Sequence, residues 1–324
     1  MTAAPPPLLV AEGVTRRFGA RGLFTRARPV QAVTDVSLSL GRGETVGLVG
    51  ESGSGKSTLG RMLLGLLPPS EGQVWFDGVD LARATPAERR VLRRRMQIVF
   101  QDPHSSLDPR RTIGAQIADG PTIHALVPPA ERRAQVEALL GQVGLAPMHA
   151  DRYPHEFSGG QRQRIGIARA LATKPKLLVA DEPVSALDVS VQAQVLALLA
   201  DLRSRFGLAL LFISHDLAVV RSLCDRVVVL YLGRVMESGP VAQVLEAPRH
   251  PYTQALLSAA PSLEASRRRT RILLQGDPPS PSAPPSGCVF RTRCPVAMPA
   301  CAETVPALVD GVACLRVGEG GVRV

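Results

Sequence analysis

The sequence predicts an α/β fold, in which short buried strands alternate with longer amphipathic helices. Three observations support this prediction. Short runs rich in apolar and β-branched residues recur through the first 250 residues, the stretches between them repeat apolar residues every three or four positions, and a glycine-rich loop joins one run to a helix. The chain has 324 residues, of which 45% are hydrophobic and 20% are charged, as expected of a globular protein with a full core.

The predicted strands are continuous apolar runs, which is typical of strands covered on both faces of a sheet. They cover residues 45–49, 97–100, 177–180, 209–213 and 227–231. The helical patterns cover residues 59–67, 131–143 and 191–206. After Ser266 the pattern changes, because an arginine run at 267–271 is followed by five prolines between 277 and 287. We therefore expect a linker that leads into a small module beginning at Cys288.

The most informative loop follows the predicted strand at 45–49 and precedes a helix. It fits the pattern GxxxxGK[ST] with the residues Gly50, Glu51, Ser52, Gly53, Ser54, Gly55, Lys56, Ser57 and Thr58. Glycines let the backbone curl so that its N–H groups converge on phosphates, and the helix N-terminus adds its positive dipole end. We expect Lys56 to contact the β and γ phosphates and the Ser57 hydroxyl to bind magnesium.

Two acids end the predicted strand at 177–180. Asp181 and Glu182 are placed at the carboxyl end of that strand, where ligands of α/β sheets bind. We interpret Asp181 as a magnesium ligand and Glu182 as the general base for an attacking water. A pair of solvated turn acids is the alternative interpretation.

Composition limits the other functional classes. The net charge is +10, which would suit a nucleic-acid or anionic-membrane partner, yet the arginines are scattered in twos and threes, as on a solvated basic face. The longest apolar runs, near 208–213 and 227–232, are far shorter than the roughly 18 residues that a membrane span needs. Residues 1–10 show no secretory signal, so we expect an intracellular protein without a disulfide framework.

A third motif indicates the family. Phe157, Ser158, Gly159, Gly160 and Gln161 resemble LSGGQ, the signature sequence of the ATP-binding cassette (ABC) ATPases, with Phe157 departing at the first position. The resemblance extends over residues 8–239. It implies that the signature of one cassette faces the γ phosphate held by the phosphate loop of a second cassette, so that two chains complete each ATP site. Taken alone, Ser158 is also a suitable helix N-cap.

Other positions resemble the family's motifs in the same order. Gln101 is similar to the glutamine that senses magnesium and water, and the segment 185–188, ending at Asp188, is similar to a loop that links paired sites. Taken alone, that segment is a helix N-cap with its aspartate in the first turn. His215 is similar to a switch histidine that contacts the γ phosphate. Phe18 is similar to the aromatic that stacks on adenine, although it could be a core residue, with Arg17 or Val33 supplying the neighbouring contact.

The resemblance also implies an architecture and a mechanism. We expect a P-loop NTPase cassette over 1–260, with a RecA-like core, an antiparallel β subdomain and a helical subdomain at about 102–172, then a linker at 261–287 and a cysteine-containing tail at 288–324. ATP and Mg²⁺ are the implied ligands. ATP binding would close a dimer of cassettes, and hydrolysis would reopen it.

Longer strings are similar to the oligopeptide/dipeptide importer branch of this family. They lie at 50–53, 153–158 and 250–257, the last reading HPYTQALL. The resemblance implies a peripheral ATPase at the cytoplasmic face of the cell membrane. Its implied partners are a second, related ATPase subunit, two permease subunits and an extracytoplasmic substrate-binding protein. Peptides are the usual cargo of this branch, and nickel, glutathione or sugars are carried by relatives.

Four of the five cysteines fall in the tail, at Cys288, Cys294, Cys301 and Cys314. Four thiolates suit an iron–sulfur cluster or zinc, although the spacing lacks the close Cys-x2-Cys pairs of zinc knuckles. The tail resembles that of the importer branch, some members of which hold a [4Fe-4S] cluster there. Reduced thiols in a small apolar tail are the other interpretation.

Two further functions compete with transport. A soluble cassette protein acting on nucleic acid is compatible with the positive charge, although the chain carries one cassette and no long coiled-coil insertion. A small-molecule kinase would share the phosphate loop but would leave residues 158–161 unexplained. We therefore expect an ATPase with no nucleic-acid partner.

Overall fold

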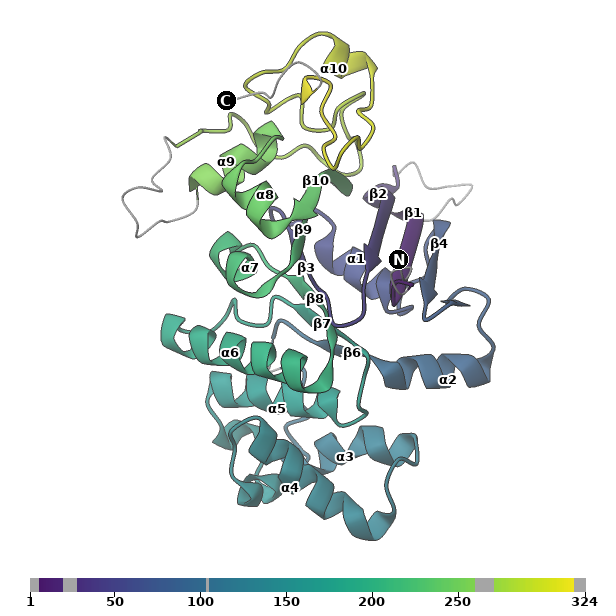
Figure 1. The fold of residues 1–324 in the computed structure, drawn as a ribbon, viewed down its shortest axis with the longest axis vertical. Helices are drawn as coiled ribbons and strands as arrows, with labels where there is room; N and C mark the ends of the chain where they lie inside the picture. The colour runs from purple at the N-terminus through teal and green to yellow at the C-terminus, as the bar shows by residue number, and fades with distance from the viewer. Residues whose placement is uncertain (1–5, 20–27, 103–104, 260–270, 318–324) are drawn as a thin grey trace, which may run out of the picture. The chain divides into compact units, whose positions relative to one another are not determined.

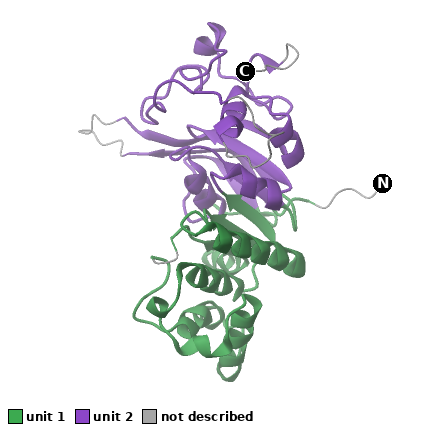
Figure 2. Cartoon of the chain, turned by 90° about the vertical axis from the view of Figure 1, so that its left-hand side faces the viewer, with its two compact units in different colours: residues 1–8, 40–44, 76–213 green, residues 9–39, 45–75, 214–324 purple. Residues whose placement is uncertain are grey.

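The chain folds into two units whose segments alternate along the sequence (Figure 2). Unit 1 contains residues 1–8, 40–44 and 76–213, and unit 2 contains residues 9–39, 45–75 and 214–324. The computed structural model describes residues 6–19, 28–102, 105–259 and 271–317, so most of the predicted arginine run at 267–271 lies outside the described residues. The domain limits at 260 and 287 remain predictions.

The strands of unit 1 form a parallel ladder. β7 (Leu177–Asp181) pairs with β6 (Met96–Val99) on one side and with β8 (Ala209–Ile213) on the other. Every residue of β7 and β8 is buried, which confirms the prediction of strands covered on both faces. The strand predicted at 97–100 begins and ends one residue earlier in the structure. Met96 already pairs with Leu177, whereas Phe100 lies beyond the strand and is 39% exposed. The two-residue strand β5 (Val79–Asp80) belongs to the same unit.

The helices of unit 1 follow the strands in the sequence. They are α2 (Pro86–Arg95), α3 (Ile113–Ile123), α4 (Arg132–Gln142), α5 (Gly159–Leu171) and α6 (Val189–Phe206), with short 3-10 turns at Pro129–Glu131, Pro147–Asp151 and Pro154–Glu156. Helices α3, α4 and α5 pack against one another, and α5 also packs against α6 (Figure 1). The predicted helices at 131–143 and 191–206 correspond to α4 and α6.

Unit 2 contains two sets of strands. β2 (Val30–Leu40), β1 (Leu9–Phe18) and β4 (Glu71–Phe76) are adjacent in that order. β3 (Thr45–Val49) runs parallel to β9 (Arg226–Tyr231), and β10 (Arg234–Pro240) runs antiparallel to β9. The predicted limits of β3 match the structure residue for residue, because all five of its residues are buried and a glycine follows directly.

The helices of unit 2 are shorter. They are α1 (Lys56–Leu63), α7 (Leu217–Leu223), α8 (Val241–Glu246), α9 (Pro251–Ala259) and α10 (Ala300–Glu303). Helix α1 begins three residues before the predicted helix at 59–67 and ends four residues earlier, since Gly65 adopts a left-handed φ of 64°. Among the described residues, no helix combines the length and the apolar character that crossing a bilayer requires.

The cysteine-containing tail is joined to the rest of unit 2 by backbone hydrogen bonds. The Ala313 N–H donates to the Met236 carbonyl at 2.9 Å, and the Ser238 N–H donates to the Gly311 carbonyl at 2.7 Å. A β-bridge between Glu237 and Val312 lies between these two bonds. The tail therefore extends the edge formed by β10, although it has little regular structure of its own.

Candidate functional site

The phosphate loop in unit 2 has the backbone that its glycines were expected to provide. Gly50 has a φ of 149° and Gly55 a φ of 101°, which are conformations that L side chains rarely adopt. A Cβ at Gly50 would lie 2.1 Å from the Leu230 carbonyl oxygen, and one at Gly55 would lie 2.2 Å from the Ala32 carbonyl oxygen. Both positions therefore require glycine for backbone conformation and for space.

Lys56 stands at the start of α1 and is only 5% exposed. Its Nζ donates to the carbonyl oxygens of Gly50 and Glu51, both at 2.8 Å. Its ammonium group is thus held across the loop, close to the backbone N–H groups that would receive phosphate. Within the same loop Ser52 and Gly53 are exposed, and Ser57 and Thr58 are half-buried in the first turn of α1.

Glu51, the second residue of the loop, is bound from two other parts of unit 2. Its N–H donates to the Tyr252 hydroxyl at 3.0 Å. Its carboxylate accepts two hydrogen bonds from Nη1 of Arg293, at 2.8 and 3.1 Å. The sequence indicated no role for Tyr252 or Arg293, because 201 and 242 residues separate them from Glu51 and no local pattern spans such distances.

The acidic pair in unit 1 lies where β7 ends. Asp181 is the last residue of β7 and is 5% exposed. Glu182 has a positive φ of 46°, and its N–H donates to the Ile213 carbonyl at 3.0 Å. Nε2 of Gln101 donates to Glu182 Oε2 at 3.1 Å, so the structure brings together two of the residues that the sequence selected. A left-handed glutamate is a strained conformation of the kind found at functional sites.

The signature segment forms the N-terminus of α5. Ser158 is the N-cap, and it exchanges hydrogen bonds with Gln161 in a capping box. Gly160 is needed for space, because a Cβ there would lie 2.3 Å from a methyl carbon of Val191. Phe157 is 4% exposed and meets the ring of His149 edge-on, with centroids 5.3 Å apart. Its side chain is therefore an apolar anchor for the segment.

The remaining predicted residues lie at the ends of elements. Asp188 is exposed and is itself the N-cap of α6. The interpretation that placed Asp188 inside the first turn of this helix is therefore wrong, because the helix begins only after Asp188. His215 is exposed in the segment between β8 and α7. Phe18 is 38% exposed at the end of β1, with the guanidinium of Arg16 placed 4.8 Å from the centre of its ring.

The surroundings of Phe18 test whether it is a core residue and whether Arg17 or Val33 is its neighbouring contact. A side chain with this exposure is not a core residue, whereas Val33 is fully buried. Arg17, the other candidate neighbour, forms an ion pair with Glu71 at 2.5 Å. Arg16 is thus the cation that lies over the Phe18 ring.

Two sets of candidate residues result, one in each unit. Unit 2 holds the loop from Gly50 to Thr58, His215 and Phe18. Unit 1 holds Gln101, the pair at 181–182, the segment at 158–161 and Asp188. The first set carries the positive groups that suit phosphates, and the second carries the acids that suit magnesium and water.

The four tail cysteines line one small cavity, together with His250 and Phe290. Burial raises the pKa of the thiols of Cys288 and Cys314, and it raises that of Cys294 to about 11. No group of three or more His, Cys, Asp or Glu side chains in the described part of the chain has an arrangement that could hold a metal ion. The structure therefore gives the cluster prediction no support.

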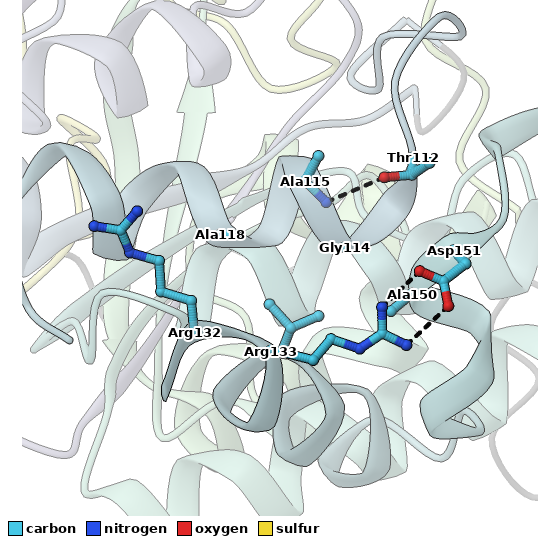
Figure 3. A pocket seen from close by; sticks show the side chains of 9 residues that line it. Thr112, Gly114, Ala115, Ala118, Arg132, Arg133, Ala150 and Asp151 are labelled. Atoms are coloured by element: carbon cyan, nitrogen blue, oxygen red, sulfur yellow. Dashed lines mark hydrogen bonds and ion pairs between the residues drawn. The ribbon is translucent and has the colours of Figure 1, made fainter. Parts of the chain in front are cut away.

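A second pocket lies in unit 1 between α3, α4 and the turn at Pro147–Asp151 (Figure 3). Arg133 and Asp151 face each other at its edge, with 2.5 Å between Nη1 and Oδ1, and the Thr112 hydroxyl caps α3. The Arg133 guanidinium lowers the pKa of Asp151. None of the predicted site residues lines this pocket, and an exposed ion pair of this kind contributes little to stability.

Two protein-family descriptions match the sequence. The description "ABC transporter" matches residues 33–185, and "Oligopeptide/dipeptide transporter, C-terminal region" matches residues 236–301. The second match covers most of β10, the HPYT string and three of the four tail cysteines. It therefore falls on the segments that contact Glu51.

Curated relatives match nearly the whole chain. The oligopeptide transport ATP-binding protein AppF of Bacillus subtilis is 53% identical over 312 residues, which are 94% of this chain and 95% of AppF. The di/tripeptide transport ATP-binding protein DppF of Pseudomonas aeruginosa is 49% identical over 302 residues, which are 93% of this chain and 94% of DppF.

Solved structures resemble the fold. The ATP-binding cassette MJ0796, in a dimeric post-hydrolysis state bound to ADP and phosphate, has a TM-score of 0.64 and 30% identity, covering 72% of this chain and 98% of that one. The protein cbiO1 of Clostridium perfringens, part of an ABC transporter complex, has a TM-score of 0.64 and 28% identity, covering 74% of this chain and 91% of that one. These similarities confirm the predicted fold class.

Proposed function

The chain is an ATP-binding protein of the ABC transporter family, in its oligopeptide/dipeptide branch, and on that premise we propose that it hydrolyses ATP to drive peptide import across the cytoplasmic membrane. The observation that carries the proposal is the combination, within one chain, of a phosphate loop, an LSGGQ-like helix start and a C-terminal region of the oligopeptide/dipeptide type. A kinase would need only the first of these features.

Unit 2 would bind the nucleotide. The loop at 50–58 would surround the β and γ phosphates with backbone N–H groups, and Lys56 would exchange its two loop carbonyls for phosphate oxygens. The exposed ring of Phe18 would stack on the adenine, with the Arg16 guanidinium on its other side. His215 would contact the γ phosphate.

Unit 1 would supply the chemistry at the γ phosphate. Glu182 would accept a proton from the attacking water, and Gln101, already bonded to Glu182, would orient that water. Mg²⁺ would be held by oxygens of Ser57, Asp181 and Gln101, which are the ligand atoms it prefers, and it would neutralise charge on the phosphates. Phosphoryl transfer needs this positioning and charge more than covalent help from the protein.

The signature helix would serve a second cassette. Ser158, Gly159, Gly160 and Gln161 begin α5, where backbone N–H groups and the helix dipole favour an anion. We infer that these residues contact ATP held by a partner ATPase, that Asp188 helps to link the paired sites, and that closure and reopening of the dimer follow binding and hydrolysis. The similarity to a dimeric cassette with bound ADP and phosphate supports this cycle.

The other proposed partners are those of oligopeptide/dipeptide importers. Relatives that are peptide transport ATP-binding proteins support a peripheral location beneath two permease subunits. An extracytoplasmic protein would deliver the peptide. The cargo within the peptide class would be selected by those other chains.

The proposal also concerns what the four tail cysteines bind. We propose a [4Fe-4S] cluster as one state of the tail because Cys288, Cys294, Cys301 and Cys314 would supply the four thiolates that such a cluster needs, although the described residues show no arrangement that could hold a metal ion. Iron and acid-labile sulfide, measured on anaerobically purified protein, would both be present at about four atoms per chain. Their absence would leave reduced thiols.

Glu182→Gln tests the function. In the complete complex reconstituted in liposomes, this variant should bind ATP but lose hydrolysis and peptide uptake by about 10²- to 10⁴-fold, the usual contribution of a general base. Its cassettes should stay associated in ATP, as measured by light scattering. Lys56→Ala is the matched variant, and it should lose ATP binding itself.

The two variants separate the competing explanations. Normal turnover by Glu182→Gln would remove the assigned base. Unchanged uptake by both variants, or retention of the purified chain on DNA or RNA that weakens steeply with salt, would point to another function.

A further inference from the structure

Residue 51 of the phosphate loop is fixed by all three of its polar groups. Its N–H donates to the Tyr252 hydroxyl, its carbonyl accepts from Lys56 Nζ and from the Ser54 N–H, and its carboxylate binds Arg293. The Lys56 and Ser54 contacts come from within the loop. The Tyr252 and Arg293 contacts come from α9 and the tail, and both are independent of where Lys56 points.

Arg293 is built into its position. Its side chain is 10% exposed and that of Glu51 is 26% exposed, so the pair is largely removed from water. Burial alone would lower the pKa of Arg293, but the Tyr231 and Glu51 side chains outweigh burial and raise this pKa, which keeps the guanidinium charged. The guanidinium carbon lies 6.0 Å from the centre of the Tyr231 ring.

An aromatic cluster fixes the two segments that bind Glu51. Phe290 is fully buried, and its ring centre lies 5.2 Å from those of both Tyr231 and Tyr252. The two tyrosine rings meet edge-on at 4.8 Å. Tyr231 ends β9, Tyr252 lies in the first turn of α9 and Phe290 belongs to the tail. This cluster therefore holds Arg293 and the Tyr252 hydroxyl at fixed positions beside the loop.

His250 adds a second link between α9 and the tail. Its Nδ1 accepts a hydrogen bond from the Tyr252 N–H at 3.0 Å, and its ring is also hydrogen-bonded to the Ala313 backbone. Burial lowers the pKa of His250 to about 3, so the ring is neutral and keeps one acceptor and one donor nitrogen. Tyr252 is thus held at its backbone N–H by His250 and at its hydroxyl by the Glu51 N–H.

We propose that Arg293 is a positioning residue for ATP binding, which acts through the carboxylate of Glu51 to keep the phosphate loop in its binding conformation. The inference rests on the proposed function. When ATP binds, Lys56 would leave the carbonyls of Gly50 and Glu51 for the phosphates, and the loop would lose two of its internal hydrogen bonds. Arg293 and Tyr252 would then keep residue 51 in place.

The effect should therefore appear in nucleotide affinity more than in turnover. Arg293→Met keeps an unbranched apolar stem but removes the guanidinium and its charge. In the intact transporter complex we expect it to raise the Kd and the KM for ATP about tenfold, as for loss of one charged hydrogen bond, while kcat changes by less than about twofold. Arg293→Lys should restore part of the affinity, because it restores the charge without the planar fork.

Arg291 provides the matched control. It lies two residues before Arg293 in the same module, and its Nε donates to the carbonyl of Ser286, just before the tail, at 2.9 Å. Arg291→Met should leave the Kd and KM for ATP unchanged. An equal rise in both variants would show that any loss of an arginine from the tail has this effect, and it would overturn the proposal.

A double-mutant cycle separates positioning from general destabilisation. Glu51→Gln keeps the shape of its side chain, and if Arg293 acts through Glu51 the double variant Glu51→Gln/Arg293→Met should be no weaker in ATP binding than the weaker single variant. Additive losses would overturn the proposal even if Arg293→Met were poorly folded on its own.

Lys56→Ala distinguishes failure of this inference from failure of the proposed function. If Lys56→Ala abolishes ATP binding and Arg293→Met leaves it unchanged, only the role of Arg293 is wrong. If Lys56→Ala also has no effect, the ATP site itself is misassigned and the inference falls with it.

Discussion

At the scale of single residues, the phosphate loop shows two different demands on glycine. Gly50 and Gly53 both have a positive φ, of 149° and 77°. They differ in their surroundings, because a Cβ at Gly50 would lie 2.1 Å from the Leu230 carbonyl oxygen whereas a Cβ at Gly53 would meet nothing within 4 Å. Of these two glycines, only Gly50 faces a backbone atom, in β9, that excludes a side chain.

This difference predicts unequal effects of alanine. Gly53→Ala should lower the free energy of unfolding by about 1–2 kcal/mol, the usual penalty of a left-handed conformation for an L residue. Gly50→Ala should lower it by more and should abolish ATP binding, since the loop or β9 must move. Urea unfolding and equilibrium ATP binding measure both effects, and equal losses in the two variants would contradict the role given to Leu230.

The contacts of Glu51 show what a single sequence cannot reveal at this scale. The motif at 50–58 was predictable because its residues are adjacent and their chemistry is known. Tyr252 was part of a string typical of the importer branch, but its bond to the Glu51 N–H depends on the fold. Nothing in the local sequence marks Arg293, since its partner is 242 residues away.

At the scale of elements, the residues that begin α5 both cap the helix and belong to the proposed ATP-binding segment. Ser158 and Gln161 form a capping box at α5, and Thr85 and Glu88 form another at α2. The two boxes have the same hydrogen-bond pattern, but only the first belongs to the LSGGQ-like segment. They therefore form a natural pair for separating the stabilising role of a cap from a role in binding ATP.

Ser158→Ala and Thr85→Ala should each lower the free energy of unfolding by about 0.5–2 kcal/mol, the usual effect of removing an N-cap. Only Ser158→Ala should weaken ATP-driven association of the cassettes, because only that hydroxyl lies at the proposed anion site. Light scattering in ATP, with both variants made in the Glu182→Gln background, measures this difference. Equal association of the two variants would remove Ser158 from the composite site.

Elements were predicted best where burial is complete. All residues of β3, β7 and β8 are buried, and continuous apolar runs gave their limits to within one residue. Boundaries were less accurate where a cap or a glycine decides them. Helix α1 begins at Lys56 and ends before Gly65, and α6 begins after Asp188, which replaces Ser185 as the expected cap.

At the scale of the whole molecule, the tail is part of the core of unit 2. Phe290 is fully buried between Tyr231 and Tyr252, and β10 bonds to the backbone at 311–313. The sequence suggested a separate module after a proline-rich linker, because composition changes there. Composition does not report which surfaces a module covers, so its packing against β9 and α9 was not predictable.

Phe290→Ala should therefore destabilise the whole of unit 2. We expect the free energy of unfolding to fall by about 3–5 kcal/mol, as for other buried aromatic residues. Leu273→Ala is the control, because Leu273 is 73% exposed and its loss should change stability by less than about 0.5 kcal/mol. Thermal unfolding followed by circular dichroism compares them, and a small effect at Phe290 would mean that the tail folds independently.

The ties between the tail and the phosphate loop also constrain how such a chain can diverge. A C-terminal segment grafted from a distant relative would bring its own counterparts of Tyr252, Phe290 and Arg293 to a foreign Glu51 and Tyr231. Selection should therefore favour inheritance of the phosphate loop and the C-terminal segment from the same parent gene. Recombination between these two parts would separate residues whose side chains pack and bond to one another. Chimeras with a junction after residue 250 should tolerate exchange best when the donor also matches at positions 51 and 231.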